Sequence, residues 1–184
     1  MSVKKESLSD SSLYRSDDEY NKIEELSKLL DDIDLNEKDE TFIRYFNNYK
    51  TVENIVRHLR ANKNNVAKTL EAVQKTIEWR YSFGVEELKE EDLKKVMLQR
   101  KMYINGHDKY NRPVIYNRKS PHKSQDHDAD LKAIVFTLEK AIKLMNDKDQ
   151  WIWVLDMQNY TRKSSPPFSL SRQTMSIFAN HYPE

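Results

Sequence analysis

The fold is decided by the most apolar run of the chain, Trp151-Ile152-Trp153-Val154-Leu155-Asp156-Met157. Bulky, aromatic and β-branched side chains follow one another here without alternation, and the run is short. This pattern predicts a strand buried on both faces, as in a sheet with helices above and below it. Open α/β sheets place ligands at the carboxyl ends of their strands, so Asp156 either faces a ligand or holds the following loop through backbone N–H groups.

Two short strands and a helix lead up to this run. Strands are expected at residues 101–104 and 113–116, on either side of a turn at Gly106. The helix is amphipathic, and its apolar residues recur at helical spacing: Leu131, Ile134, Val135, Leu138, Ala141, Ile142 and Met145. A helix between the second strand and the Trp151 run forms a β-α-β crossover, which predicts parallel pairing of these strands and an α/β fold.

A polar loop, residues 117–129, precedes this helix. It contains His122, Asp126, His127 and Asp128, and imidazole and carboxylate groups both ligate divalent metals. No pair of histidines one helical turn apart is present to pre-organise such a site. We therefore predict a solvated loop and no metal site.

The first half of the chain is predicted to form a small helical bundle. Three apolar faces recur there at helical spacing: Phe42, Tyr45, Phe46 and Tyr49; Val52, Ile55, Val56 and Leu59; and Val66, Leu70, Val73 and Ile77. Thr51 and Asn65 are expected N-caps, and Gly84 is an expected C-terminal cap. One connecting helix or two short ones should follow. We assign residues 37–98 to this helical lobe and residues 99–184 to the lobe that contains the sheet.

Residues 1–36 precede the bundle as an acidic, serine-rich tail. Its composition cannot bury much surface, so we expect disorder at least to Asp18. Apolar residues then recur at helical spacing: Ile23, Leu26, Leu29, Leu30 and Ile33. They predict a short amphipathic helix that docks on the body of the protein.

The composition excludes several classes of protein. The 184 residues contain no cysteine, which excludes disulfides and thiolate chemistry, and only two glycines, which leave no Gly-rich phosphate loop. The formal net charge of +1 predicts no attraction to nucleic acid or membranes from bulk charge. No stretch approaches the ~20 apolar residues of a membrane span, and no signal-peptide pattern is present. We expect a cytoplasmic protein that is at most peripheral on membranes.

Four segments occur in the order and spacing of a known family. They are Arg57-His58-Leu59-Arg60-Ala61-Asn62-Lys63 with Glu78-Trp79-Arg80; Gly106-His107-Asp108-Lys109-Tyr110-Asn111-Arg112-Pro113-Val114; Trp153-Val154-Leu155-Asp156; and His181-Tyr182-Pro183-Glu184. Together they resemble the CRAL-TRIO (Sec14-like) lipid-binding family, from about Glu37 onward. That family usually has glycine where this chain has Asn111, and Asn tolerates the left-handed backbone that the turn requires.

The resemblance implies an apolar cavity, floored by a sheet and roofed by helices, that holds one phospholipid without covalent chemistry. Burial of acyl chains contributes ~0.8 kcal/mol per CH2 group, so such a protein needs a large dry cavity and a few polar groups for the head group. We therefore predict phospholipid binding or transfer, with phosphatidylinositol as a candidate ligand. The resemblance implies no enzyme activity, no cofactor other than the phospholipid, and no nucleic-acid partner.

The resemblance also implies four lipid-binding residues: Lys63, Tyr103, Thr161 and Glu184. Glu184 corresponds to a residue that helps bind an inositol head group, and Lys63 to a basic residue near the phosphate. Tyr103 and Thr161 correspond to hydroxyl contacts with a choline head group. The structural alternatives are strand packing for Tyr103, a loop hydrogen bond for Thr161, and a solvated helix face for Lys63 and Arg60. Arg57 is predicted to be a structural ion-pair partner.

The resemblance ends about halfway through the family's lipid-binding lobe. We therefore expect a helical N-terminal lobe followed by an incomplete βαβ lobe with a short mixed sheet. The Trp151 strand should then lie at or beside an edge of the sheet, and the chain alone should not seal a lipid pocket. The alternative function is a truncated, non-transferring member that acts as a protein-interaction module. A second copy or a protein partner would then cover the sheet. Peripheral membrane contact is the remaining expected interaction.

Overall fold

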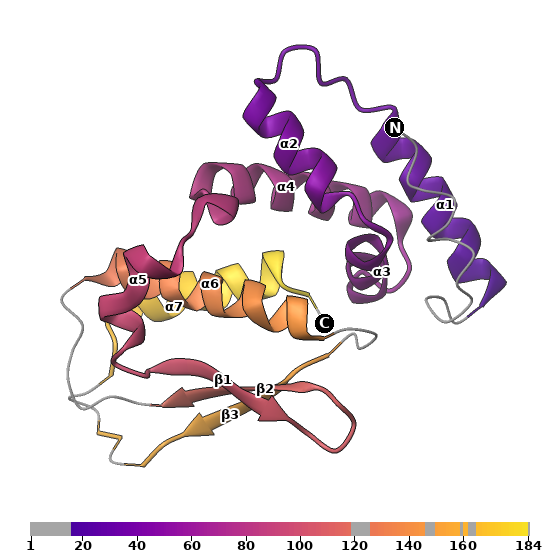
Figure 1. The fold of residues 1–184 in the computed structure, drawn as a ribbon. Helices are drawn as coiled ribbons and strands as arrows, with labels where there is room; N and C mark the ends of the chain where they lie inside the picture. Colours follow the sequence, from indigo (N-terminus) through magenta and orange to yellow (C-terminus); the bar gives the residue numbers. More distant parts are fainter. Residues whose placement is uncertain (1–15, 119–125, 146–149, 159, 162–164, 184) are drawn as a thin grey trace. The chain divides into compact units, whose positions relative to one another are not determined.

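The computed structural model describes residues 16–118, 126–145, 150–158, 160–161 and 165–183 (Figure 1). The elements are α1 (Asp17–Asp31), α2 (Glu40–Tyr49), α3 (Val52–Ala61), α4 (Val66–Phe83), a 3-10 turn (Val85–Glu87), α5 (Glu90–Met97), β1 (Met102–His107), β2 (Pro113–Arg118), α6 (His127–Leu144), β3 (Ile152–Asp156) and α7 (Phe168–His181). Contacts divide the chain into two compact units. We call Met1–Glu86 with Phe178–Glu184 the helical unit, and Glu87–Ile177 the sheet unit. The domain boundaries proposed from the sequence stay predictions.

The helices of the helical unit begin at polar side chains that cap them. Asp39 Oδ1 accepts a hydrogen bond from the backbone N–H of Phe42 at 2.8 Å, and Ser16 caps α1 in the same way. Thr51 and Asn65 cap α3 and α4 as predicted. Gly84 ends α4 at φ 73°, the left-handed conformation that glycine adopts without a Cβ clash.

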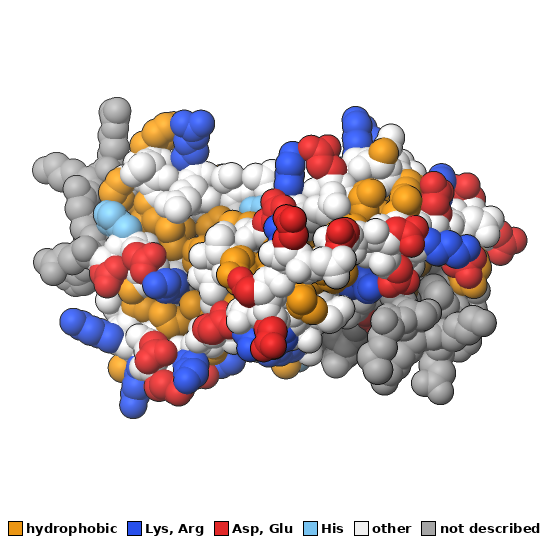
Figure 2. All heavy atoms as spheres, turned by 90° about the horizontal axis from the view of Figure 1, so that it is seen from above, with side chains coloured by type: hydrophobic (Ala, Val, Ile, Leu, Met, Phe, Trp, Pro, Cys, Tyr) orange, Lys and Arg blue, Asp and Glu red, His pale blue; other side chains and the backbone are white. Residues whose placement is uncertain are grey.

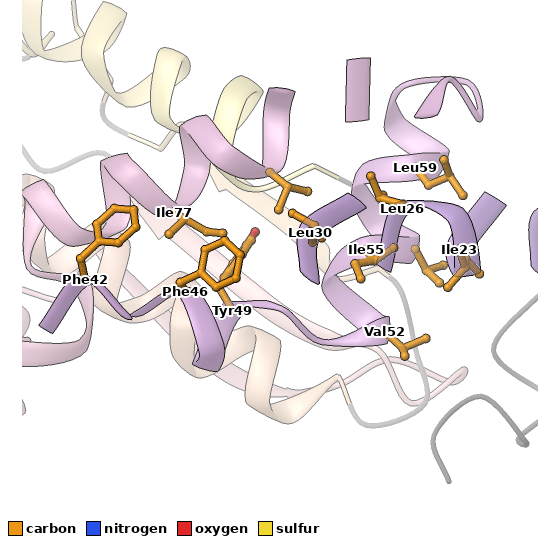
Figure 3. Packing of buried hydrophobic residues seen from close by; sticks show 12 residues of the cluster. Ile23, Leu26, Leu30, Phe42, Phe46, Tyr49, Val52, Ile55, Leu59 and Ile77 are labelled. Atoms are coloured by element: carbon orange, nitrogen blue, oxygen red, sulfur yellow. The ribbon is translucent and has the colours of Figure 1, made fainter. Parts of the chain in front are cut away.

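The core of the helical unit is formed by α1, α2, α3 and α4 (Figure 3). Ile23, Leu26 and Leu30 of α1 are each 0% exposed, and they pack with the predicted aromatic face of α2 and apolar face of α3. The predicted amphipathic helix is therefore confirmed. It begins at Asp17 and is a structural part of this core. The expectation of disorder as far as Asp18 is therefore wrong for Asp17 and Asp18, because Ser16 caps the helix there.

One ion pair joins distant parts of this unit. Arg60 Nε donates to Glu19 Oε1 at 2.8 Å, and Glu19 is 3% exposed. The structural alternative given for Arg60, a solvated helix face, is therefore wrong, because the buried carboxylate of α1 needs a cationic partner. Among the described residues Arg57 forms no ion pair, contrary to prediction, and its guanidinium hydrogen-bonds to Asn54 instead.

A second polar cluster ties the end of the chain to α4. The ring of Trp79 stacks on His181 with centroids 4.2 Å apart, and Thr76 Oγ1 lies 3.1 Å from His181 Nδ1. Burial, with the charge of Arg80, lowers the pKa of His181 to about 4. Burial likewise lowers the pKa of His58 to about 4, with smaller effects of nearby charges, and Nε2 of its ring lies 2.8 Å from the Tyr49 hydroxyl. Both imidazoles are therefore neutral at pH 7.

The sheet unit contains a three-stranded mixed sheet in the order β1-β2-β3. β1 and β2 pair antiparallel, β2 and β3 pair parallel, and α6 makes the crossover, so the predicted hairpin, crossover and α/β fold are confirmed. In the hairpin turn Asp108 accepts hydrogen bonds from the backbone N–H groups of Tyr110 and Arg112. Asn111 adopts φ 62°, so it takes the left-handed position as predicted.

The strand at residues 152–156 is less buried than the sequence predicts. Trp151 is 9% exposed, but Leu155 is 59% exposed and the other residues of β3 are partly exposed. The prediction of burial on both faces is therefore wrong, because β3 lies at the edge of the described sheet. That edge position agrees with the expectation for an incomplete lobe.

Candidate functional site

The register of the strands assigns each side chain to one of two faces of the sheet. Paired residues on adjacent strands share a face, and successive residues of a strand alternate between faces. One face carries Met102, Ile104, Ile115, Trp153 and Leu155. The opposite face carries Tyr103, Val114, Tyr116, Ile152 and Val154. We call the second set the tyrosine face.

Helices cover the first of these faces. Ile115 is 0% exposed and Met102 is 8% exposed. Helix α6 packs against β1 and β2, and Figure 1 shows α5 and α6 on a single side of the sheet. Because Ile115 is the central residue of this face, its complete burial identifies the side that the helices cover.

The tyrosine face is apolar and only partly buried. Tyr103, Tyr116, Ile152 and Val154 are all of intermediate exposure. The rings of Tyr103 and Tyr116 stack with centroids 5.4 Å apart and planes 10° apart. In the described part of the sheet unit, Figure 1 shows no helix over this face. The arrangement offers an apolar floor with two phenol hydroxyls. By the same register, Arg118 and Asp156 lie on this face where β2 and β3 end.

The end of β3 is held by local polar contacts. Asp156 Oδ1 accepts a hydrogen bond from the backbone N–H of Gln158 at 2.9 Å. Its other oxygen lies 3.6 Å from Arg118 Nε, and both side chains are substantially exposed. This geometry supports the structural alternative for Asp156, which is to hold the loop that follows the strand.

The four predicted lipid-binding residues fall in different parts of the molecule. Tyr103 lies on the tyrosine face, and Thr161 is exposed in the segment after β3. Lys63 is an exposed residue of the helical unit, in the turn between α3 and α4, where it has φ 55°. Glu184 lies outside the described residues. Their roles toward a lipid stay predictions.

Sequence reasoning missed the partners of Tyr103 on its face. Val114 and Val154 stand in two of the segments that carry the family resemblance, but no motif places them, Tyr116 or Ile152 beside Tyr103. Only the register of two strand pairs does so. The signal in the sequence was that successive residues of β2 point to opposite faces of the sheet. This alternation shows which residues of the strand share a face, but it does not show which face the helices cover.

Other kinds of site were sought in the described residues. Among them no group of three His, Asp or Glu side chains is placed to hold a metal ion, and His122 lies outside them. Within the same residues, no helix combines the length and apolar character that crossing a bilayer requires. The helical unit has an open groove of about 290 Å³ whose apolar floor includes Ile33, Phe42 and Ile77.

The sequence is similar to proteins of one family. Residues 98–184 match the model of the CRAL/TRIO domain. The chain is 28% identical over 145 residues to the phosphatidylinositol transfer protein PDR17 of Saccharomyces cerevisiae, covering 72% of this chain and 41% of that protein. It is 30% identical over 146 residues to Patellin-6 of Arabidopsis thaliana, and the match covers 71% of this chain and 35% of that protein.

A CRAL-TRIO domain-containing protein of Schizosaccharomyces pombe is 27% identical over 135 residues, which cover 73% of this chain and 13% of that protein. The chain thus spans less than half the length of these relatives.

Proposed function

Because residues 98–184 belong to the CRAL/TRIO domain family, we propose that this chain supplies the apolar floor of a phospholipid-binding or phospholipid-transfer site. The tyrosine face is that floor, and acyl chains lie against Tyr116, Ile152 and Val154. Binding and release involve no covalent step. One relative is named a phosphatidylinositol transfer protein, which makes phosphatidylinositol the first ligand to test.

The observation that carries this proposal is the partly exposed apolar sheet face, whose opposite side carries the helices that the structure describes in this unit. An acyl chain that covers such a face removes apolar surface from water on both partners, at about 25 cal/mol per Å². A flat floor leaves the other side of the lipid wet, so we expect weak retention by this chain alone. This agrees with the expectation that the chain does not seal a pocket.

The head group would be held by the residues that the family resemblance indicates. In the proposal Tyr103 of the sheet unit donates its phenol hydrogen to a head-group oxygen, and Thr161 of the same unit adds a hydroxyl contact. For the helical unit the resemblance proposes, separately, a charge-assisted contact of Lys63 with a phosphate and hydrogen bonds from inositol hydroxyls to Glu184.

The test is native mass spectrometry of the purified 184-residue chain after incubation with phosphatidylinositol, followed by extraction of bound lipid. We expect a one-to-one complex that is weakened by Val154→Ser. The matched control is Leu155→Ser, because Leu155 is the next residue of β3 and lies on the opposite face. Absence of any complex, or equal weakening by both substitutions, would refute a lipid floor on the tyrosine face.

A second function is favoured by the edge of the sheet. β3 is an edge strand of the described sheet, and Leu155 and Met157 are 59% and 49% exposed. An unprotected edge with exposed apolar residues is a template for pairing with another strand. A chain that binds no lipid but forms a stable dimer or heteromeric complex through this edge would be an interaction module instead.

A further inference from the structure

Helix α7 has two opposite faces within the sheet unit. Leu170 and Ile177, seven residues apart, are 8% and 5% exposed. Phe168 and Met175, also seven residues apart, are 82% and 67% exposed. Residues at i, i+4 and i+7 share one side of a helix, so the exposed Arg172 lies between Phe168 and Met175 on the outer side. We call Phe168, Arg172 and Met175 the α7 stripe.

The α7 stripe differs from an isolated exposed hydrophobic residue. Single exposed apolar side chains are common on protein surfaces, but an aromatic and a methionine aligned along one helix side form a directed contact surface. Pro167 comes immediately before Phe168 and is itself exposed. The backbone N–H of Ser171 donates to the carbonyl of Pro167 at 3.1 Å, so the first turn of α7 is closed and holds Phe168 in helical backbone geometry.

The charged residues around the α7 stripe in the sequence are all basic. The chain contains 30 Asp and Glu residues among 184, yet none occurs from Met157 to Pro183, where Arg162, Lys163 and Arg172 stand. On the surface seen in Figure 2, by contrast, basic and acidic side chains are interspersed. Arg172 forms no ion pair within the described part of the chain. An anionic partner is therefore the electrostatic complement of the α7 stripe.

We propose that the α7 stripe docks on the surface of an anionic lipid membrane. Phe168 and Met175 enter the boundary between head groups and acyl chains, and Arg172 lies among anionic head groups. Binding of a helix to a membrane surface grows with the apolar area that it buries and with the attraction of its cations to anionic lipids, and the α7 stripe supplies both contributions. This surface is separate from the tyrosine face, so the inference goes beyond the lipid floor and does not depend on it.

A second copy of the chain suits the α7 stripe less well. In a two-fold symmetric contact centred on the stripe, Arg172 would face the same residue of the partner, because isologous interfaces juxtapose identical patches. No acidic side chain is available in the flanking sequence to separate the two charges. A membrane rich in anionic lipid has no such conflict.

The test is sedimentation of the 184-residue chain with vesicles of phosphatidylcholine alone or mixed with phosphatidylserine. We expect binding to the mixed vesicles only, weakening as salt is added because the charge contact is screened. The double variant F168S/M175S should lower the partition coefficient on the order of tenfold, since it removes two apolar anchors. Arg172→Gln should lower it roughly fivefold, the effect of one cation near an anionic surface.

The control variants separate this surface from other exposed apolar residues. Leu98→Ser removes a side chain that is 71% exposed in the same unit, outside the acid-free stretch, and should leave binding unchanged. Phe168→Leu keeps an apolar anchor and should bind nearly as well as the original chain. Circular dichroism shows whether F168S/M175S is folded. If it is not, the vesicle binding of Arg172→Gln and the difference between neutral and anionic vesicles still test the proposal.

Three results would overturn the proposal: equal binding to both vesicle types, no effect of Arg172→Gln, or equal losses with Leu98→Ser and the double variant. A change of oligomeric state in the double variant, without loss of vesicle binding, would assign the stripe to a protein contact instead. Lipid extracted from the purified variants reports on the tyrosine face separately. Its amount should match that of the original chain.

Discussion

The helical unit buries most of the apolar residues of its helices in one core, whereas in the described part of the sheet unit one face of the sheet is only partly buried and β3 is an edge strand. In the helical unit α1, α3 and α4 contribute core residues with almost no exposure, and the buried carboxylate of Glu19 is paired. In the sheet unit complete burial is limited to the helix side, and the tyrosine face stays partly exposed. The difference indicates that substitutions in the helical unit should act on stability, and substitutions on the tyrosine face on binding.

The largest expected effect contrasts the two units directly. Leu26→Ala, at a residue that is 0% exposed, should lower the free energy of unfolding by about 3 kcal/mol through lost burial and a cavity. Val154→Ala on the tyrosine face should cost less than about 1 kcal/mol, because its neighbours leave it partly in water. Urea unfolding followed by circular dichroism measures both values. Equal losses of unfolding free energy in the two variants would contradict the difference in burial between the two units.

A smaller effect is expected from the buried ion pair of the helical unit. Glu19→Gln should cost about 2 kcal/mol, since it leaves the guanidinium of Arg60 with a weaker partner in a largely buried site. The control is Lys22→Gln, which removes the exposed ion pair with Asp18 and should cost about 0.5 kcal/mol or less. Similar costs for the two variants would show that burial of the Glu19 pair contributes nothing.

Stability should also depend on pH through the buried imidazoles. The pKa of His58 falls from 6.5 to about 4 on folding, so the unfolded chain binds the proton more readily. The stabilisation is present in full above pH 6.5 and is lost as the pH falls toward 4. We expect His58 to account for about 1–2 kcal/mol of this loss. His58→Gln should flatten the fall in urea midpoint between these pH values, and an unchanged slope would contradict the assignment.

The smallest effect on stability is expected where the tyrosine rings stack. Tyr116→Ala should cost about 1 kcal/mol or less, because the stack with Tyr103 is partly exposed. The same substitution should lower the fluorescence of an apolar dye bound to the chain, since it removes part of the exposed floor. Arg112→Gln, in the hairpin turn, serves as a control for dye binding. A large loss of stability with unchanged dye binding would place Tyr116 in the core.

Sequence patterns determined the local structure of this protein. The caps at Thr51, Asn65 and Gly84, the apolar faces of α2 and α3, the hairpin with Asn111 in its turn, and the β-α-β crossover were all predicted. These features depend on residues a few positions apart and on two periods, about 3.6 in helices and 2 in strands. The family resemblance likewise depended on short segments in order.

Only the tertiary structure decided which predicted element meets which other one. The pair of Arg60 with Glu19 joins residues 41 positions apart, and the contact of Thr76 with His181 joins residues 105 apart. The apolar run at Trp151 predicted burial on both faces, yet β3 is an edge strand with Leu155 exposed. A side chain's apolar character fixes the free energy that it would gain from burial, but whether it is buried depends on neighbours that no local pattern names.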